Sequence, residues 1–130
     1  MNTEIKVYYE DTDASERVYY ANYLKFLERG RTDYLYNLGF THKNILEKYK
    51  FYFVVKNCKI DYKKPAYFED KLKIKTTLLN PPSYSIEFQY EIFKDQILIN
   101  EGYTKLIFFN KINNKPIRCP KDIADTINNF

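Results

Sequence analysis

The chain has 130 residues, of which 45% are hydrophobic, 29% are charged and 18% are aromatic. This length predicts a single domain over residues 1–130, and the composition excludes a disordered or fibrous chain. The formal net charge of +4 suits an anionic small molecule but is too diffuse to indicate nucleic-acid binding.

The two cysteines and the apolar segments bear on compartment and cofactors. Cys58 and Cys119 are too few for a zinc tetrad, so we expect no metal, and both should be free thiols. We expect Cys58 to be a small buried side chain, and Arg118 to lower the pKa of Cys119. Residues 1–10 lack the apolar block of a signal peptide, and no stretch approaches the ~18 apolar residues of a membrane span. A cytoplasmic protein without a transmembrane segment is therefore expected.

The first half of the chain combines one strand with one long helix. Alternation over residues 4–9 predicts a strand, and the polar segment Glu10–Arg17 predicts a turn after it. Apolar residues at spacings of three and four then predict an amphipathic helix over Tyr19–Leu38, ended by Gly39. Gly30, in the middle of this helix, allows a close approach to whatever covers it.

The second half is mostly strand. Thr41 is placed to cap a short helical segment, and Pro120 to occupy the first position of a final helix. The predicted elements are strands Phe51–Tyr62, Lys71–Leu78, Ile86–Ile92 and Ile97–Phe109, and a helix over Lys121–Asn128. Consecutive strands joined by short turns are antiparallel, and one long apolar helix needs a sheet to cover it. The predicted class is α+β, a hotdog fold with a curved antiparallel sheet of about five strands around one central helix.

The residues between the first strand and the long helix are the best candidates for chemistry. Glu10, Asp11 and Asp13 place three carboxylates just before a helix N-terminus, where unpaired N–H groups and the helix dipole favour an anion. The same field keeps Asp13 ionised, and the N–H groups can polarise a carbonyl as an oxyanion hole does. A carboxylate and such donors facing one carbonyl form a workable acyl-transfer site. From composition alone, ordinary helix capping explains these residues more often than catalysis does.

The segment VYYEDTDASERVYYANYLKFLERGRTDYLY, residues 7–36, carries a family resemblance. Together with residues 53–55, 61–66, 69–70 and 116–120, it resembles the YbgC-like branch of the 4-hydroxybenzoyl-CoA thioesterase family over nearly the whole chain. The resemblance implies a hotdog-fold acyl-CoA thioesterase that needs no metal or cofactor, coenzyme A being part of the substrate. It also implies assembly as a homodimer or homotetramer, with the acyl pocket between subunits.

The resemblance also assigns the reacting groups. The second aspartate of the family's Asp-x-Asp motif matches Asp13, as nucleophile or as general base. The backbone N–H that binds the thioester oxygen matches Tyr20, where many relatives have histidine. Glycine is common in relatives at the Ser15-Glu16-Arg17 turn, and we expect Arg17 to remove backbone freedom there. Asp11 is expected to shape the turn rather than to react.

Substrate-binding residues follow less directly. Asn22 and Tyr23 match the family block and are candidates to shape the pocket, although Tyr23 also lies on the apolar stripe, which favours a core position. The phosphates of coenzyme A need cations. The candidate cations near predicted turns are Lys63, Lys64, Arg118 and Lys121. Ser85, at the start of a predicted strand, matches a position where relatives often contribute a pocket side chain.

Other functions remain open at this point. Hydrolysis of acyl groups on acyl carrier protein is one alternative, since its acidic surface suits the net charge. A non-catalytic acyl-binding or adaptor protein linked to the Tol–Pal envelope system is another. A dehydratase is disfavoured because His42, the only histidine, lies in the wrong segment and is expected to be exposed and structural. The order of elements also disfavours an RNA-binding module.

Overall fold

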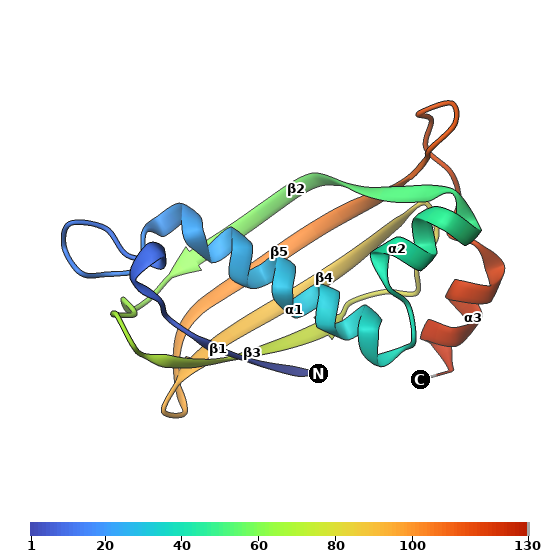
Figure 1. The fold of residues 1–130 in the computed structure, drawn as a ribbon. Helices are drawn as coiled ribbons and strands as arrows, with labels where there is room; N and C mark the ends of the chain where they lie inside the picture. Colours follow the sequence, from blue (N-terminus) through green and yellow to red (C-terminus); the bar gives the residue numbers. More distant parts are fainter. Residues whose placement is uncertain (130) are drawn as a thin grey trace.

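The computed structural model describes residues 1–129, which form a curved sheet wrapped around one helix (Figure 1). The strands are β1 (Asn2–Lys6), β2 (Phe51–Tyr62), β3 (Lys71–Leu78), β4 (Ser85–Lys94) and β5 (Ile97–Asn110). The helices are α1 (Tyr23–Asn37), α2 (His42–Asn44) and α3 (Lys121–Asn128). Short 3-10 turns cover Tyr9–Asp11 and Tyr20–Asn22, and a π-helical turn covers Ile45–Tyr49. The predicted α+β architecture of five strands around a central helix is confirmed.

The sheet is fully antiparallel, with strand order β1-β3-β4-β5-β2. Strands β3, β4 and β5 follow one another as hairpins, as predicted. Strand β2, however, pairs with β5 rather than with β3, which follows it in the sequence. Residues 63–70 therefore carry the chain from one side of the sheet to the other, and β1 and β2 form its two edges.

Helix α1 packs against the concave face of the sheet through side chains that include Phe26 and Leu27. Two glycines make this contact close. A Cβ atom on Gly30 would lie 2.6 Å from Oγ1 of Thr76, and one on Gly102 would lie 2.8 Å from Cδ1 of Leu27. Each distance is far below van der Waals contact, so the helix sits this deep because both positions lack a side chain. The role predicted for Gly30 is confirmed.

The ends of the first elements differ from the predicted ones. The strand β1 ends at Lys6 instead of residue 9, because the chain turns at Tyr9–Asp11. The long helix was expected from Tyr19, but that residue is extended and a 3-10 turn precedes α1.

The other termini follow the expected chemistry more closely. Gly39 has φ +91°, and its N–H donates to Tyr36 O at 3.0 Å while the N–H of Phe40 donates to Leu35 O at 2.9 Å, which closes α1 as predicted. The side chain of Thr41 caps α2, accepting from the N–H of Asn44 at 3.0 Å, also as predicted. Pro120 is the N-cap of α3 and not its first helical residue.

The two cysteines occupy different environments. Both are free thiols, as predicted. Cys58 is exposed, contrary to expectation, because the second half of β2 is an edge strand that α1 does not cover. Cys119 is buried, and this burial raises the pKa of its thiol to about 12. The expected lowering by Arg118 is present but is outweighed by burial.

Candidate active site

The loop that precedes α1 is held against the connection between β2 and β3. Thr12 pairs with Val18, and Arg17 pairs with Tyr67, as isolated antiparallel bridges. The N–H of Val18 also donates to Ala66 O at 2.8 Å. These backbone bonds fix the loop at the left end of the molecule in Figure 1, next to the start of the helix.

Asp11 supports this loop from inside. Its carboxylate is 3% exposed and accepts two hydrogen bonds, from the N–H of Tyr8 and from Nδ2 of Asn22, both at 2.8 Å. The bonds join the end of β1 to the start of the helix. Asp11 therefore shapes the turn as predicted, and the buried Asn22 side chain holds Asp11 instead of facing the pocket.

Asp13 stands two residues further on and is exposed. Its Oδ1 accepts from the Ser15 N–H at 2.8 Å and from the Ser15 hydroxyl. These bonds, with a smaller contribution from Arg17, hold the pKa of Asp13 below its usual range. Within residues 1–129, Oδ2 has no hydrogen-bond partner. Asp13 thus carries its charge at neutral pH and keeps one oxygen free, which is what a nucleophile or general base needs.

The first turn of the helix lies beside Asp13. The N–H of Asn22 donates to Tyr19 O at 2.8 Å. The N–H groups of Tyr20 and Ala21 lie at the helix start, where the helix offers no carbonyl to accept from them. The hydroxyl of Tyr62, at the end of β2, donates to Tyr20 O at 2.8 Å. Burial is the main cause of a raised pKa for Tyr62, so this hydroxyl stays protonated and remains a donor at neutral pH.

Tyr62 was not singled out from the sequence. Its only sequence signal is its place in the matching segment 61–66, because a tyrosine at the end of a strand does not reveal which carbonyl its hydroxyl reaches.

A pocket of about 330 Å³ joins these groups. Its lining residues are Asp13, Arg17, Val18, Tyr20, Tyr23, Tyr62, Lys63, Lys64 and Pro65. Of the predicted site residues, the structure therefore brings Asp13, Tyr20, Tyr23 and Lys64 together. Lys63 forms an ion pair with Asp61 at 3.2 Å, whereas Lys64 and Arg17 are exposed cations beside Asp13.

Tyr23 is both a core residue and part of the pocket wall. It is only 3% exposed and belongs to the hydrophobic core, which the apolar stripe favoured. Its hydroxyl accepts from the N–H of Ala66 at 3.3 Å and so ties the helix to the pocket wall.

Ser85 and Arg118 lie far from Asp13 within one chain. Ser85 begins β4, and the ten residues of that strand place it about 30 Å from Lys94, which contacts Asp70 near the loop. Arg118 stacks over Tyr84 at the same distant end. A single chain does not bring these two residues to the Asp13 pocket.

The turn after Asp13 departs from the expectation in one respect. Glu16, and not Arg17, has the left-handed backbone, with φ +66°. Glycine is therefore favoured at Glu16, where a side chain costs about 1–2 kcal/mol. Arg17 instead lays its guanidinium over the ring of Tyr67, with Cζ 5.8 Å from the ring centroid.

A curved antiparallel sheet wrapped around one long helix defines a hotdog protein. An ionised carboxylate beside the N–H groups of a helix start is an arrangement that suits acyl transfer. The family model of the Thioesterase-like superfamily matches residues 7–127. The chain belongs to this superfamily, which confirms the family resemblance seen in the sequence.

Relatives and solved structures agree with this assignment. The chain is 36% identical over 119 residues to the acyl-CoA thioesterase YbgC of Haemophilus influenzae, covering 92% of this chain and 88% of the relative. It is 33% identical over 121 residues to the acyl-CoA thioester hydrolase YbgC of Escherichia coli, covering 92% and 90%. The DHNA-CoA thioesterase of Staphylococcus aureus superimposes with a TM-score of 0.91 at 30% identity, covering 98% of this chain and 88% of that one.

Within residues 1–129, no helix has the length and apolarity to cross a membrane. No three His, Cys, Asp or Glu side chains in this part of the chain come together in a way that could hold a metal ion.

Proposed function

We propose that this chain hydrolyses acyl-CoA thioesters to a carboxylic acid and coenzyme A, with Asp13 as the catalytic carboxylate. The observation that carries the proposal is the free, charged oxygen of Asp13 in the same pocket as the start of the helix at Tyr20. Membership in the superfamily and the YbgC relatives support the same reaction.

The geometry suggests the following sequence of events. The thioester carbonyl oxygen accepts a hydrogen bond from the Tyr20 N–H, which stabilises the oxyanion as charge develops; such a donor is worth roughly 3–4 kcal/mol. Asp13 either attacks the carbonyl carbon, giving a mixed anhydride that water then hydrolyses, or takes a proton from a water that attacks directly. In both routes the C–S bond breaks and coenzyme A leaves as a thiolate. Both routes need only water and groups of this chain, so we propose no cofactor.

Lys64 and Arg17 complete the pocket as cations. They are exposed beside Asp13, where they are available to the phosphates or to other anionic groups of the substrate. The Cys58 thiol, free and exposed, is compatible with a reducing compartment, and we propose a cytoplasmic location.

The test is thiol release from short-, medium- and long-chain acyl-CoAs, with wild type beside Asp13→Asn. The variant keeps the size of the side chain and removes its charge, so we expect activity to fall by orders of magnitude while the melting temperature changes little. Equal hydrolysis by both proteins contradicts the role of Asp13. If neither protein hydrolyses any acyl-CoA, the proposal fails, and acyl carrier protein thioesters are then the next substrates to test.

Turnover in H₂¹⁸O distinguishes the nucleophilic route from the general-base route. Mass spectrometry of the peptide that contains Asp13 reports whether the carboxylate has acquired ¹⁸O. Label in that peptide identifies the nucleophilic route.

We further propose that the working form is a dimer that pairs through β2. This edge strand has twelve residues and leaves Val54 38% and Val55 47% exposed. An exposed edge of this length is a surface for pairing with a second copy. Such pairing covers the end of β2 that carries Tyr62, next to the Asp13 pocket.

Sedimentation velocity tests the dimer. We expect the double variant Val54→Lys/Val55→Lys to dissociate and to lose activity. Ile112→Lys is the matched control, because Ile112 is an apolar side chain 80% exposed on the turn after β5 and is not part of the β2 strand. A fully active monomeric wild type contradicts the proposal.

A further inference from the structure

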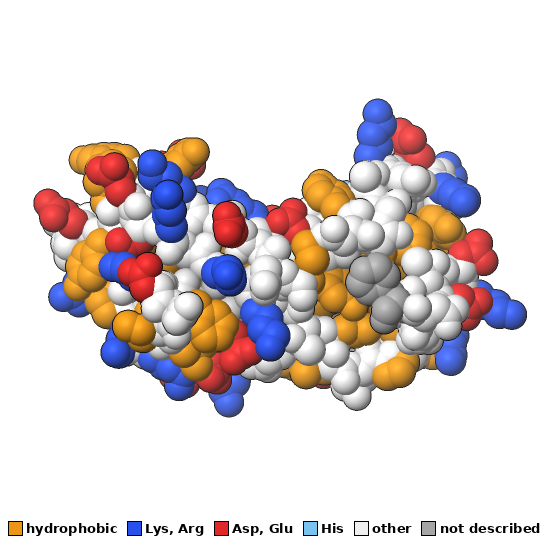
Figure 2. Space-filling view, turned by 90° about the horizontal axis from the view of Figure 1, so that it is seen from below, with side chains coloured by type: hydrophobic (Ala, Val, Ile, Leu, Met, Phe, Trp, Pro, Cys, Tyr) orange, Lys and Arg blue, Asp and Glu red, His pale blue; other side chains and the backbone are white. Residues whose placement is uncertain are grey.

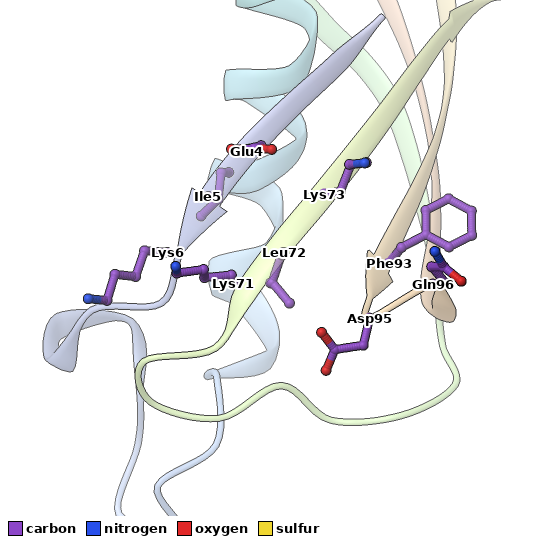
Figure 3. A pocket seen from close by; sticks show the side chains of 9 residues that line it. All are labelled: Glu4, Ile5, Lys6, Lys71, Leu72, Lys73, Phe93, Asp95 and Gln96. Carbon is purple, nitrogen blue, oxygen red and sulfur yellow. The ribbon is translucent and has the colours of Figure 1, made fainter.

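A second groove, of about 650 Å³, lies away from the Asp13 pocket, across β1, β3 and the turn between β4 and β5 (Figure 3). Its lining residues are Glu4, Ile5, Lys6, Lys71, Leu72, Lys73, Phe93, Asp95 and Gln96. It shares no residue with the pocket of Asp13 and Tyr20. The thioesterase chemistry leaves this groove unused.

The register of the strands arranges the polar side chains of the groove. Lys6 on β1 stands directly opposite Lys71 on β3, and Lys73, two residues further along β3, stands opposite Phe93 on β4. Directly opposed residues point to the same face of a sheet. Figure 3 accordingly shows the two opposed lysines at one end of the groove, and Phe93, Asp95 and Gln96 at the other.

The opposed pair Lys6–Lys71 is unfavourable in the unliganded protein. Like charges directly opposite each other across a pair of strands destabilise a sheet. The ion pairs within residues 1–129 are Lys63–Asp61 and Lys94–Asp70, so neither Lys6 nor Lys71 has a carboxylate at ion-pair distance. Glu4, the acidic side chain of β1 in this groove, stands opposite Lys73 instead. Lys75, on the same face of β3, differs because it stands opposite Glu91. In the view from below, basic side chains on this end of the molecule are interspersed with acidic ones (Figure 2).

An anion between Lys6 and Lys71 removes this repulsion. Their Cα atoms are about 5 Å apart as a cross-strand pair, which lets both ammonium groups reach neighbouring phosphates. Phe93 lies one strand across and two residues along from Lys71, about 8 Å away from Cα to Cα. Its ring is half-buried and offers a surface on which a planar base can stack.

The turn at the far end of the groove adds polar groups. Asp95 and Gln96 form the two-residue turn between β4 and β5, with φ +49° and +70°. A carboxylate there repels phosphate but accepts hydrogen bonds from the hydroxyls of a sugar. The groove is therefore cationic at one end, and aromatic and hydroxyl-binding at the other.

We propose that this groove binds a nucleoside diphosphate, with its phosphates on Lys6 and Lys71, its base on Phe93 and its ribose near Asp95. The site is separate from the thioesterase pocket and does not depend on the function proposed for it.

Isothermal titration of the full-length protein with ADP, AMP and adenosine tests the proposal. We expect ADP to bind more tightly than AMP, adenosine to give no measurable heat, and added salt to weaken ADP binding. Lys71→Gln should weaken ADP binding roughly tenfold or more, since it removes a charge-assisted contact. Lys75→Gln is the matched control and should bind ADP as wild type does, because Lys75 does not line the groove.

Thermal unfolding supplies a second readout. Without nucleotide, Lys71→Gln should be at least as stable as wild type, because it relieves the repulsion from Lys6. ADP should raise the melting temperature of wild type and not that of the variant. Weaker binding caused by misfolding would instead lower the stability of the variant.

Four results overturn the proposal. The first is the absence of ADP binding at millimolar concentration, and the second is a loss of ADP binding in Lys75→Gln equal to that in Lys71→Gln. The third is loss of ADP binding in Lys64→Gln. The fourth is binding of an acidic protein, such as acyl carrier protein, to the groove without any binding of ADP. Loss of ADP binding in Lys64→Gln would indicate that ADP binds in the Asp13 pocket and not in this groove.

Discussion

Replacing Tyr62 by phenylalanine tests whether the first turn of the helix is held in place for catalysis. The hydroxyl of Tyr62 donates to Tyr20 O at 2.8 Å, and its ring packs edge-on against Tyr23, with the centroids 5.5 Å apart. Phenylalanine keeps the ring and removes only the hydrogen bond. The hydroxyl holds the carbonyl of the Tyr20–Ala21 peptide, so the role we propose for Tyr62 is to fix residue 20 and thereby the direction of its N–H, which belongs to the preceding peptide.

The expected effect on stability is small and the effect on rate is large. Tyr62 is 48% exposed, so water replaces the lost donor and folding loses at most about 1 kcal/mol. The oxyanion donor is worth roughly 3–4 kcal/mol only when it is aligned, and a displacement near 1 Å costs about 100-fold. We therefore expect kcat to fall between tenfold and 100-fold with a much smaller change in KM.

Steady-state kinetics of Tyr62→Phe beside Tyr52→Phe separates this role from a structural one. Tyr52 lies on the same strand, and its hydroxyl donates to Oδ1 of Asn114 at 2.9 Å, far from the site. Both variants lose one exposed hydrogen bond, but only Tyr62→Phe should lose kcat. Equal kcat in the two variants would refute the positioning role.

Three further outcomes follow from the loop and the thiols. Ser15→Ala removes the hydroxyl hydrogen bond, the largest cause of the lowered pKa of Asp13, and keeps the bond from the backbone N–H of residue 15. The pKa should therefore rise part of the way to its ordinary value, and the acidic limb of the kcat/KM profile should move to higher pH; an unmoved limb contradicts the assignment of that limb to Asp13. Glu16→Gly removes the strain of a side chain on a left-handed backbone, so the free energy of unfolding in urea should rise by about 1 kcal/mol. A lower free energy of unfolding would show that contacts of the Glu16 side chain stabilise the protein by more than this strain. In a timed thiol titration at neutral pH one thiol, Cys58, should react at once, and Cys119, with its pKa of about 12, should react only after denaturation.

Local patterns predicted the elements well. The bounds of β2, β3 and α3 agree with the alternation and the turn residues, because those signals act over a few neighbours. The partner of β2 was not predictable in the same way. Alternation shows which residues share a face, but it does not say which strand lies alongside, and residues 63–70 cross the sheet instead of making a hairpin.

Burial along β2 shows a related limit. Cys58 lies inside a predicted strand, and cysteine is a small side chain that is usually buried, which led to the expectation of a buried Cys58. The strand is at the edge of the sheet and extends past the cover of α1, so both of its faces are open in one chain. Position in the sheet, and not residue type, decides the exposure of Cys58.

The site was predictable in kind but not in detail. The sequence placed three carboxylates before a helix, and the resemblance selected Asp13. Which residue takes the left-handed backbone and which hydroxyl fixes the helix start both depend on contacts with residues 62–68, about fifty positions away. No local pattern contains those contacts.

Asp11 and Asp13 lie two residues apart, but substituting them should affect the protein in different ways. Asp11 joins the end of β1 to the helix start through Tyr8 and Asn22. A screen that scores only enzyme activity in cells cannot tell loss of Asp11 from loss of Asp13, since we expect both to abolish turnover. The amount of soluble protein should separate them, because only the change at Asp11 leaves a buried donor, Nδ2 of Asn22, and a partly buried one, the N–H of Tyr8, unpaired. We therefore expect sequence variants at these two positions to be of different kinds, with a defect of folding at Asp11 and a defect of chemistry at Asp13.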